Sequence, residues 1–292
     1  MKNWMKGLAT GILVLGLGAC STTAETKTDL DTGKKVEIEN KSKVTAQEVY
    51  KKTIAVAEEQ KSMHAKMEID QLIKVPSQEL EMISKIKMDM DMIMEPLSMY
   101  QKMNMDMGEQ GKLDAEIYMT DAGFFMNEPG SGEWIKLPDE MYEGMIGQMG
   151  GGADPTLDMN MFKEFADDFK FEQTEDAYIL TLSASGDKFS KLFKAVATEN
   201  MPAGLEMNEE QAEVMENMEV KSLDYEIFID KKTFYTNAFN MKMDMTMKVE
   251  GQEMHIDQKV NAGISNINKI DKIEVPQEVL DNAIDINQSM SQ

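Results

Sequence analysis

The chain has 292 residues and a formal net charge of −23, because 53 acidic residues outweigh 30 basic residues, all of them Lys. Nucleic-acid binding needs a basic stripe and favours Arg, so this composition excludes a nucleic-acid partner. The single Cys excludes a disulfide framework and any zinc site built from several thiolates. The outlier is Met, with 30 residues against 11 Phe and 2 Trp.

The N-terminus has the pattern of an export signal. Residues 7–18 form an uncharged apolar run of about 18 Å as a helix, too short for a hydrocarbon core of about 30 Å, so we predict a signal peptide over 1–19. The ending Leu17-Gly18-Ala19-Cys20 resembles the lipobox of bacterial lipoproteins. The resemblance implies a diacylglyceryl group on Cys20 and an anchor in the extracytoplasmic face of the cell membrane. The alternative is an ordinary secretory signal with a chance Cys.

Residues 20–44 form a polar segment without a periodic apolar face. We predict a lipidated Cys followed by a flexible tether with an average reach of about 25–30 Å. The stretch Asp29-Leu30-Asp31-Thr32-Gly33 looks like the start of a calcium loop, but Gly33 stands at a ligand position and Asn40 replaces the terminal Glu. We therefore predict no calcium site there.

The folded part begins with a helix and continues with strands. Thr45 and Glu48 have capping-box spacing, which predicts a helix over 45–61. After it the hydrophobic period changes from 3.6 to 2, which is typical of half-buried antiparallel strands. We expect about ten or eleven strands, among them 63–74, 87–94, 103–107, 113–120, 123–128, 177–184, 219–230, 241–247 and 251–264. Turns are predicted at Asp230-Lys231-Lys232 and Glu250-Gly251-Gln252.

Helical patterns interrupt the strands in the middle of the chain. Pro138 opens one short helix, and Asp154-Pro155 caps a second one that runs to about Asp168. Two more are predicted over 186–198 and 208–218, and a terminal turn or short helix at 275–280. No composition break divides these pieces. We predict one α+β domain over 45–292, with a large antiparallel sheet and a helical insertion at about 138–218.

This order of elements resembles the LolA and LppX type of lipoprotein. More narrowly, residues 117–126 (IYMTDAGFFM), which run into 132–137 (GEWIKL), are similar to uncharacterised Gram-positive lipoproteins of that architecture. The resemblance implies a curved half-barrel with helices on its concave face and a cavity for a lipid or another apolar ligand. The chain departs from the type because it uses Met where Leu, Val and Phe are expected.

Met residues alternate with polar ones along three of the predicted strands. Fixing a Met side chain costs about 1.5–2 kcal/mol of rotamer freedom, against about 0.5–1 for Leu, so Met suits a surface that stays adaptable. One interpretation is a ligand-binding groove; the alternative is the buried face of a solid core. The residues concerned are Met88, Met90, Met92, Met94, Met103, Met105, Met107, Met241, Met243, Met245 and Met247.

Two features of the sequence bear on metal binding and catalysis. Thioethers bind Cu(I), and the two His residues, His64 and His255, each follow a Met, so they are candidates to meet across strands. The alternating Met spacing is explained by packing, so we predict no metal and no cofactor. The chain carries no G-x-S-x-G, H-E-x-x-H, Walker A or G-x-G-x-x-G motif. We therefore predict that it is not an enzyme.

A second class of function stays open. The protein is then a surface interaction or sensing module with a solid core, an unknown protein partner and no small-molecule ligand. The segment 141–161 distinguishes the two classes, because it is either a lid over the sheet or an exposed interface.

Overall fold

A computed structural model describes residues 23–27, 35, 39, 41–127, 129, 132–142, 169–185, 190, 214, 217–249 and 251–286. The predicted signal peptide and Cys20 lie outside the described residues. So does most of the predicted helical insertion, although residues 139–142 are helical at its expected start.

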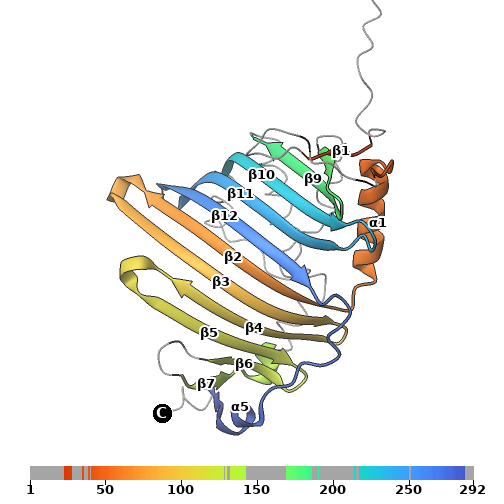
Figure 1. Cartoon of the computed structure of the whole chain (residues 1–292). Coiled ribbons are helices and arrows are strands. Elements are labelled where there is room, and N and C mark those ends of the chain that lie inside the picture. Colours follow the sequence, from red (N-terminus) through yellow and green to blue (C-terminus); the bar gives the residue numbers. More distant parts are fainter. Residues whose placement is uncertain are drawn as a thin grey trace, which may run out of the picture.

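The described part of the chain forms one large sheet (Figure 1). Its strands are β1 (Glu25–Thr26), β2 (Ser62–Val75), β3 (Leu80–Met94), β4 (Leu97–Asp106), β5 (Lys112–Thr120), β6 (Gly123–Asn127), β7 (Trp134–Lys136), β8 (Lys170–Gln173), β9 (Ala177–Ala184), β10 (Glu219–Asp230), β11 (Thr236–Val249), β12 (Gln252–Ser265) and β13 (Ile284–Asp285). Their order is β1-β8-β9-β10-β11-β12-β2-β3-β4-β5-β6-β7-β13. Only the two edge pairs, β1 with β8 and β13 with β7, are parallel.

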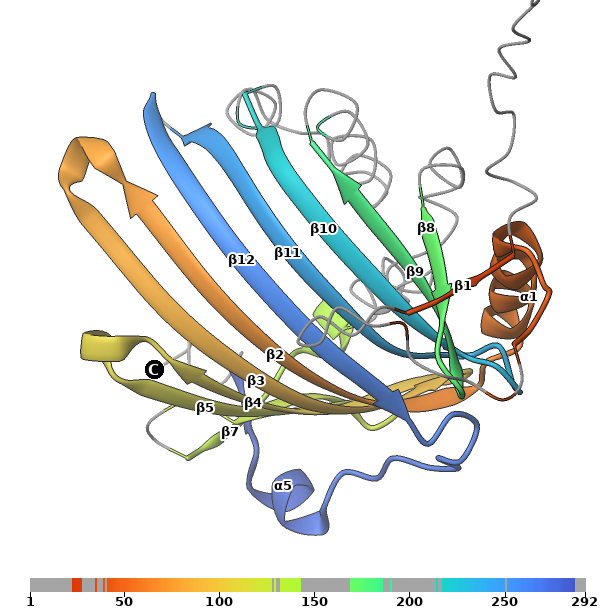
Figure 2. The ribbon, with the colours of Figure 1, turned by 45° about the horizontal axis from the view of Figure 1, so that its top comes forward.

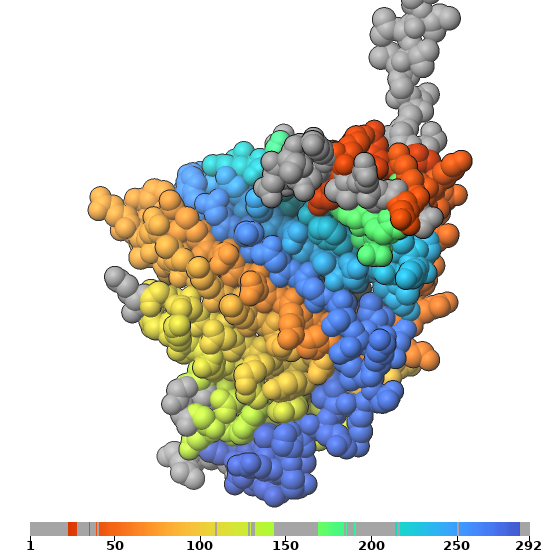
Figure 3. Space-filling model, in the orientation of Figure 1, coloured from red at the N-terminus to blue at the C-terminus, as the bar shows by residue number. Residues whose placement is uncertain are grey.

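The sheet is open, long-stranded and strongly curved (Figure 2), which confirms the predicted curved antiparallel sheet. In the space-filling view β2, β3, β4 and β12 make one continuous surface, and the segment after β12 runs along its edge (Figure 3). The sheet of the described residues has 13 strands, more than the ten or eleven expected. The additional strands are short: β1 and β13 have 2 residues each, β7 has 3 and β8 has 4. A strand of two to four residues is too short to show a hydrophobic period.

Within the described ranges, the helices α1 and α5 accompany the strands, besides the helical residues 139–142. The helix α1 (Ala46–Glu58) has the predicted capping box, in which the Thr45 hydroxyl accepts from the Glu48 amide at 3.2 Å and the Glu48 carboxylate accepts from the Thr45 amide at 2.8 Å. The short helix α5 (Gln277–Asn282) occupies the predicted place near the C-terminus. Two 3₁₀ turns, η2 (Pro76–Gln78) and η3 (Gly108–Gln110), connect β2 to β3 and β4 to β5.

Charged residues alternate with apolar ones along the central strands, so one face of the sheet is polar. Lys87 pairs with Glu68 across β3 and β2 at 3.2 Å, and Lys102 pairs with Glu116 across β4 and β5 at 2.8 Å. Exposed pairs of this kind contribute little to stability. A slip of one residue would bring them to the apolar face, so the alternation specifies the register.

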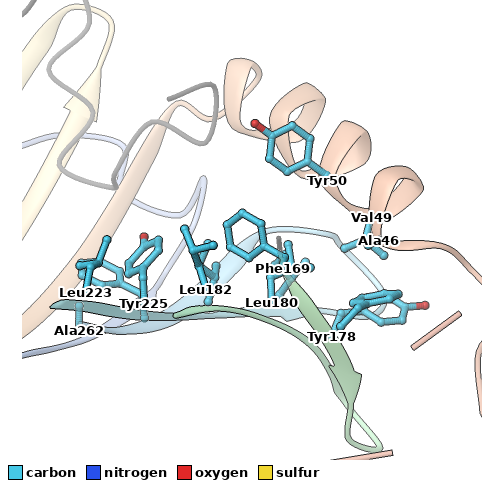
Figure 4. Close-up of a cluster of buried hydrophobic side chains, with 14 of the residues drawn as sticks. Ala46, Val49, Tyr50, Phe169, Tyr178, Leu180, Leu182, Leu223, Tyr225 and Ala262 are labelled. Atoms are coloured by element: carbon cyan, nitrogen blue, oxygen red, sulfur yellow. The ribbon is translucent and has the colours of Figure 1, made fainter. Parts of the chain in front are cut away.

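The opposite, apolar face carries two hydrophobic cores. The first, which we call the α1 core, lies where α1 covers the strands bearing Leu180, Leu182, Leu223 and Tyr225 (Figure 4). The second, which we call the methionine core, lies at the other side of the sheet. Its buried members are Met63, Ala65, Met90, Met92, Met99, Met119, Tyr142 and Ile264. The Tyr142 hydroxyl donates to the Thr120 carbonyl and so satisfies its polar atom within this core.

Part of the predicted flexible tether differs from the expectation. Residues 25–26 form β1 on the edge of the sheet, Ala24 is buried, and Thr23 forms a bridge with Thr45. The physical reason is the edge strand β8, whose backbone N–H and C=O groups need partners. A polar segment can supply them without any apolar pattern of its own.

Candidate functional site

The strand register brings most of the predicted ligand-binding Met residues to one face. Met88 lies opposite Met103, and Met243 lies opposite Leu223, whose side chain is buried in the α1 core. The pairs continue across β12 and β2, so the Met residues of β3, β4 and β11 share the apolar face. Met107 is the exception, because it follows β4 and precedes the turn η3.

Six of these residues belong to the two cores. Met90 and Met92 are buried in the methionine core, and Met94 packs against it. Met243 is buried in the α1 core, and Met241 and Met245 pack against it. These side chains are in contact with the protein's own hydrophobic groups.

Four of the predicted Met residues lie in strands but belong to neither core: Met88, Met103, Met105 and Met247. Each is half-buried. Met247 lies apart, opposite Met254 of β12. The other three are neighbours, since Met88 faces Met103, and Met105 lies between Ile86 and Leu113. We call Met88, Met103 and Met105, together with Ile86 and Leu113, the methionine strip.

The methionine strip is an apolar surface on which large side chains stand beside a small one. Met103 faces the small side chain of Ala115 on β5, and Leu113 at the strip's margin is 38% exposed. The Gln101 amide, on the same face, donates to the Met88 sulfur at 3.6 Å. Long flexible side chains beside a small one can rearrange around a guest of variable shape.

A hollow of about 570 Å³ lies on the opposite, polar face of the same sheet. One row of its lining runs across five strands as Asp224, Lys242, Lys259, Asp70 and Lys85. The next row contains Leu72 directly opposite Ile83, which is 55% exposed. Sequence reasoning missed this hollow because alternating charge predicts a solvated face. The signal was the pair Leu72 and Ile83, which are out of phase with the apolar residues around them.

Stacked tyrosines on the polar face have raised pKa values. The Tyr100 and Tyr118 rings stack with 4.7 Å between centroids, and the Tyr100 hydroxyl donates to Glu116 at 3.1 Å. Burial, together with the Glu116 carboxylate, raises the pKa of both Tyr100 and Tyr118. Both phenols are therefore protonated at neutral pH, and the pair acts as a structural contact.

The two His residues do not meet. His64 lies opposite Ser265 of β12, ten positions and roughly 34 Å along that strand from His255. Each has a carboxylate partner instead, Asp91 at 2.8 Å from His64 and Glu253 at 2.8 Å from His255. Within the described ranges, no group of three or more His, Cys, Asp or Glu could hold a metal ion.

No helix in the part of the chain that the structure describes is long and apolar enough to cross a membrane. The fold and the site together define a class of protein with an open, curved, mostly antiparallel sheet. The apolar face of this sheet carries two hydrophobic cores and, outside them, half-buried Met residues.

The chain belongs to a family of unknown function, DUF6612, whose family model matches residues 45–284. No curated protein matches the sequence. The match spans the helix α1 and all strands except β1 and the last residue of β13, so the family corresponds to the folded part.

Several solved structures are similar to this chain at low identity. LprF from Mycobacterium bovis has 9% identity and a TM-score of 0.38, with 79% of this chain and 95% of that chain covered. The lipoprotein LppX from Mycobacterium tuberculosis has 8% identity and a TM-score of 0.38, with 78% and 98% covered. A putative outer membrane lipoprotein-sorting protein domain from Vibrio parahaemolyticus has 9% identity and a TM-score of 0.23, with 80% and 98% covered. At these scores the likeness supports no conclusion about ligand or activity.

Proposed function

We propose that this protein is a non-enzymatic bacterial lipoprotein, anchored through Cys20 to the extracytoplasmic face of the membrane, that binds a lipid or another apolar molecule on its methionine strip. The supporting observation is that Met88, Met103 and Met105 are adjacent, half-buried and outside both cores. On the same face, Met90, Met92 and Met94 of β3 and Met241, Met243 and Met245 of β11 instead pack within or against a core.

The chemistry of the strip fits an acyl chain better than a polar ligand. Covering apolar surface contributes about 25 cal/mol per Å², without directional demands on the guest. Thioether side chains adapt to the guest's shape, so one strip accepts chains of different length and saturation. The strip offers one polar contact, the Gln101 amide beside Met88, for a group on the ligand.

The experiment is a titration of the delipidated protein with cis-parinaric acid, a fluorescent fatty acid. The test variant is Met88→Gln with Met103→Gln, which keeps the side-chain length and adds polarity. The matched control is Lys87→Gln with Lys102→Gln, because these residues precede the two Met on the same strands and project from the polar face. We expect affinity to fall at least tenfold in the Met variant and to stay unchanged in the control. Equal affinity in both variants would refute the strip as the site.

The anchor has its own test. Mass spectrometry of the N-terminal peptide from membranes should find a diacylglyceryl group on Cys20, and Cys20→Ser should move the protein to the soluble fraction. An unmodified Cys20 on a membrane-bound protein would exclude this anchor.

A second candidate function is a surface interaction module. The polar-face hollow favours it, because the exposed Ile83 stands there among charged residues of both signs. Ile83→Asp should then abolish capture of a protein partner and leave cis-parinaric acid binding unchanged. If that variant instead changes fatty-acid binding alone, the interaction-module hypothesis is wrong.

A further inference from the structure

One buried glutamine joins both ends of the segment between Cys20 and α1. The Gln173 side chain on β8 is completely buried. Its amide nitrogen donates to the Ala24 carbonyl at 2.7 Å and to the Ser42 carbonyl at 3.3 Å, and its amide oxygen accepts from the Ser42 amide at 3.0 Å. The segment therefore satisfies both donors and the acceptor of this side chain, which would be unpaired in its absence.

Residues 24–27 also cover the edge of the sheet with their backbone. Glu25 pairs with Glu172 and Thr26 with Gln173 in parallel register, and the Lys27 amide donates to the Gln173 carbonyl at 3.0 Å. The Lys27 ammonium lies 2.8 Å from Glu226 and 5.1 Å from the centre of the Phe228 ring. We call residues 24–27, with their contacts to Gln173, the latch.

The chain returns to its starting point before α1 begins. The Tyr178 hydroxyl donates to Ser42 at 2.8 Å, and Thr23 forms a bridge with Thr45, the capping residue of α1. The domain thus holds Thr23. Only two residues separate it from Cys20, so Cys20 can lie at most about 11 Å away, less than half the reach expected of a free 24-residue tether.

We propose that the latch holds the edge at β1 and the N-terminal end of α1 against the bilayer, so that the domain stands on the membrane in a fixed orientation. This inference rests on the lipid anchor at Cys20 proposed above; the interaction partner is a lipid bilayer surface. The turn η2 lies at the opposite end of the molecule (Figures 1 and 2). The strand β2 that leads to it has 14 residues and is itself about 45 Å long.

The first experiment measures the height of two positions above the membrane. The acylated thiol of Cys20 is unreactive, so Gln47→Cys in α1 and Ser77→Cys in η2, both at exposed positions, each provide one labelling site. The lipidated protein is labelled with a fluorophore and placed in phosphatidylcholine–phosphatidylglycerol vesicles that carry a headgroup nitroxide. We expect strong quenching at position 47 and little at position 77. Equal quenching at both positions would overturn the proposal.

The second experiment releases the latch. Gln173→Leu keeps the volume and removes the three hydrogen bonds, so quenching at position 47 should fall as the longer tether is freed. Gln101→Leu, on β4, is the matched control and should leave the quenching unchanged. If Gln173→Leu does not fold, Lys27→Glu, which repels Glu226 at the surface, gives the same readout. Unchanged quenching in the folded variant would exclude the latch.

Hydrogen exchange separates a failed latch from a failed anchor. In the lipidated protein in detergent, the Lys27 amide should exchange its hydrogen slowly. In the Gln173→Leu variant this exchange should be at least tenfold faster. Rapid exchange of this amide with the lipid present on Cys20 would disprove the latch alone. Absence of the lipid would disprove the anchor, and with it the membrane contact.

Discussion

The two sides of the sheet are stabilised by different chemistry. The α1 core, over β8 to β12, consists mostly of Leu, Ile, Val, Phe and Tyr side chains beneath a capped helix. The methionine core, over β2 to β5, is built around Met63, Met90, Met92, Met99 and Met119. Aliphatic and aromatic side chains have few rotamers to lose, whereas Met has many. One sheet thus carries a rigid frame on one side and a core of side chains with many rotamers on the other.

The two sides of the sheet have different roles. The α1 core positions the sheet and, through Ala24, the latch. The methionine side provides apolar area that adjusts to a guest. Variants on each side therefore have different expected consequences.

Loss of a large side chain from the rigid side should have the largest effect. Leu223 is 1% exposed in the α1 core, so Leu223→Ala should lower the free energy of unfolding by about 2–5 kcal/mol. Urea denaturation measures this value. The control Leu280→Ala, at a position 39% exposed in α5, should change it by no more than about 0.5 kcal/mol. Similar losses for the two variants would contradict the assignment of the frame.

Removing the side-chain amide of Gln173 should cause the next largest loss in the free energy of unfolding. Gln173→Leu leaves the Ser42 amide and two carbonyls without their partner, which costs about 1–3 kcal/mol. The same denaturation experiment detects it. No loss of stability would mean that the segment is not held as the structure describes.

Replacing Met by Leu on the adaptable side should have a smaller effect. For Met90→Leu with Met92→Leu the volume is nearly conserved, so we expect a change of less than about 1.5 kcal/mol per site. Both residues lie in the methionine core and outside the methionine strip, so the affinity for cis-parinaric acid should stay unchanged. A loss as large as that of Leu223→Ala would show that this core is as specifically packed as the other.

The smallest expected effect is the pH response of the α1 capping box. Hydrogen bonds from the Thr45 amide and hydroxyl lower the pKa of Glu48 below 4.5. A carboxylate whose pKa is lower in the folded state stabilises the protein above its unfolded pKa, and this contribution is lost as the pH falls through the folded pKa. Glu48→Gln should therefore lower Tm at pH 7, and the difference in Tm between the unmodified protein and the variant should be smaller at pH 3. A difference that is constant with pH would exclude the charged cap.

The sequence predicted the elements that have a clear period. The alternation of Met and Asp in 87–94 identified a strand and its two faces, and the bounds expected for β9 and β10 are confirmed within one residue. The capping pair Thr45 and Glu48 located the start of α1 correctly.

The short edge elements could not be predicted, because β1 and β13 have 2 residues each and no pattern. The latch is ordered by backbone pairing and by one Gln that lies 149 residues away from Ala24 in the sequence. Such long-range polar contacts leave no local signal. For the same reason the sequence left open whether His64 and His255 meet, since only the register of β2 on β12 reveals their separation.

The most direct test of the central claim is an oxidation footprint with bound ligand. Hydrogen peroxide converts accessible Met to the sulfoxide, and peptide mass spectrometry resolves each site. The account predicts that oleic acid slows oxidation of Met88, Met103 and Met105 at least fivefold, while Met141, which is 60% exposed, reacts at its original rate. Oleic acid that binds and leaves the oxidation of all three strip residues unchanged would contradict the proposed site.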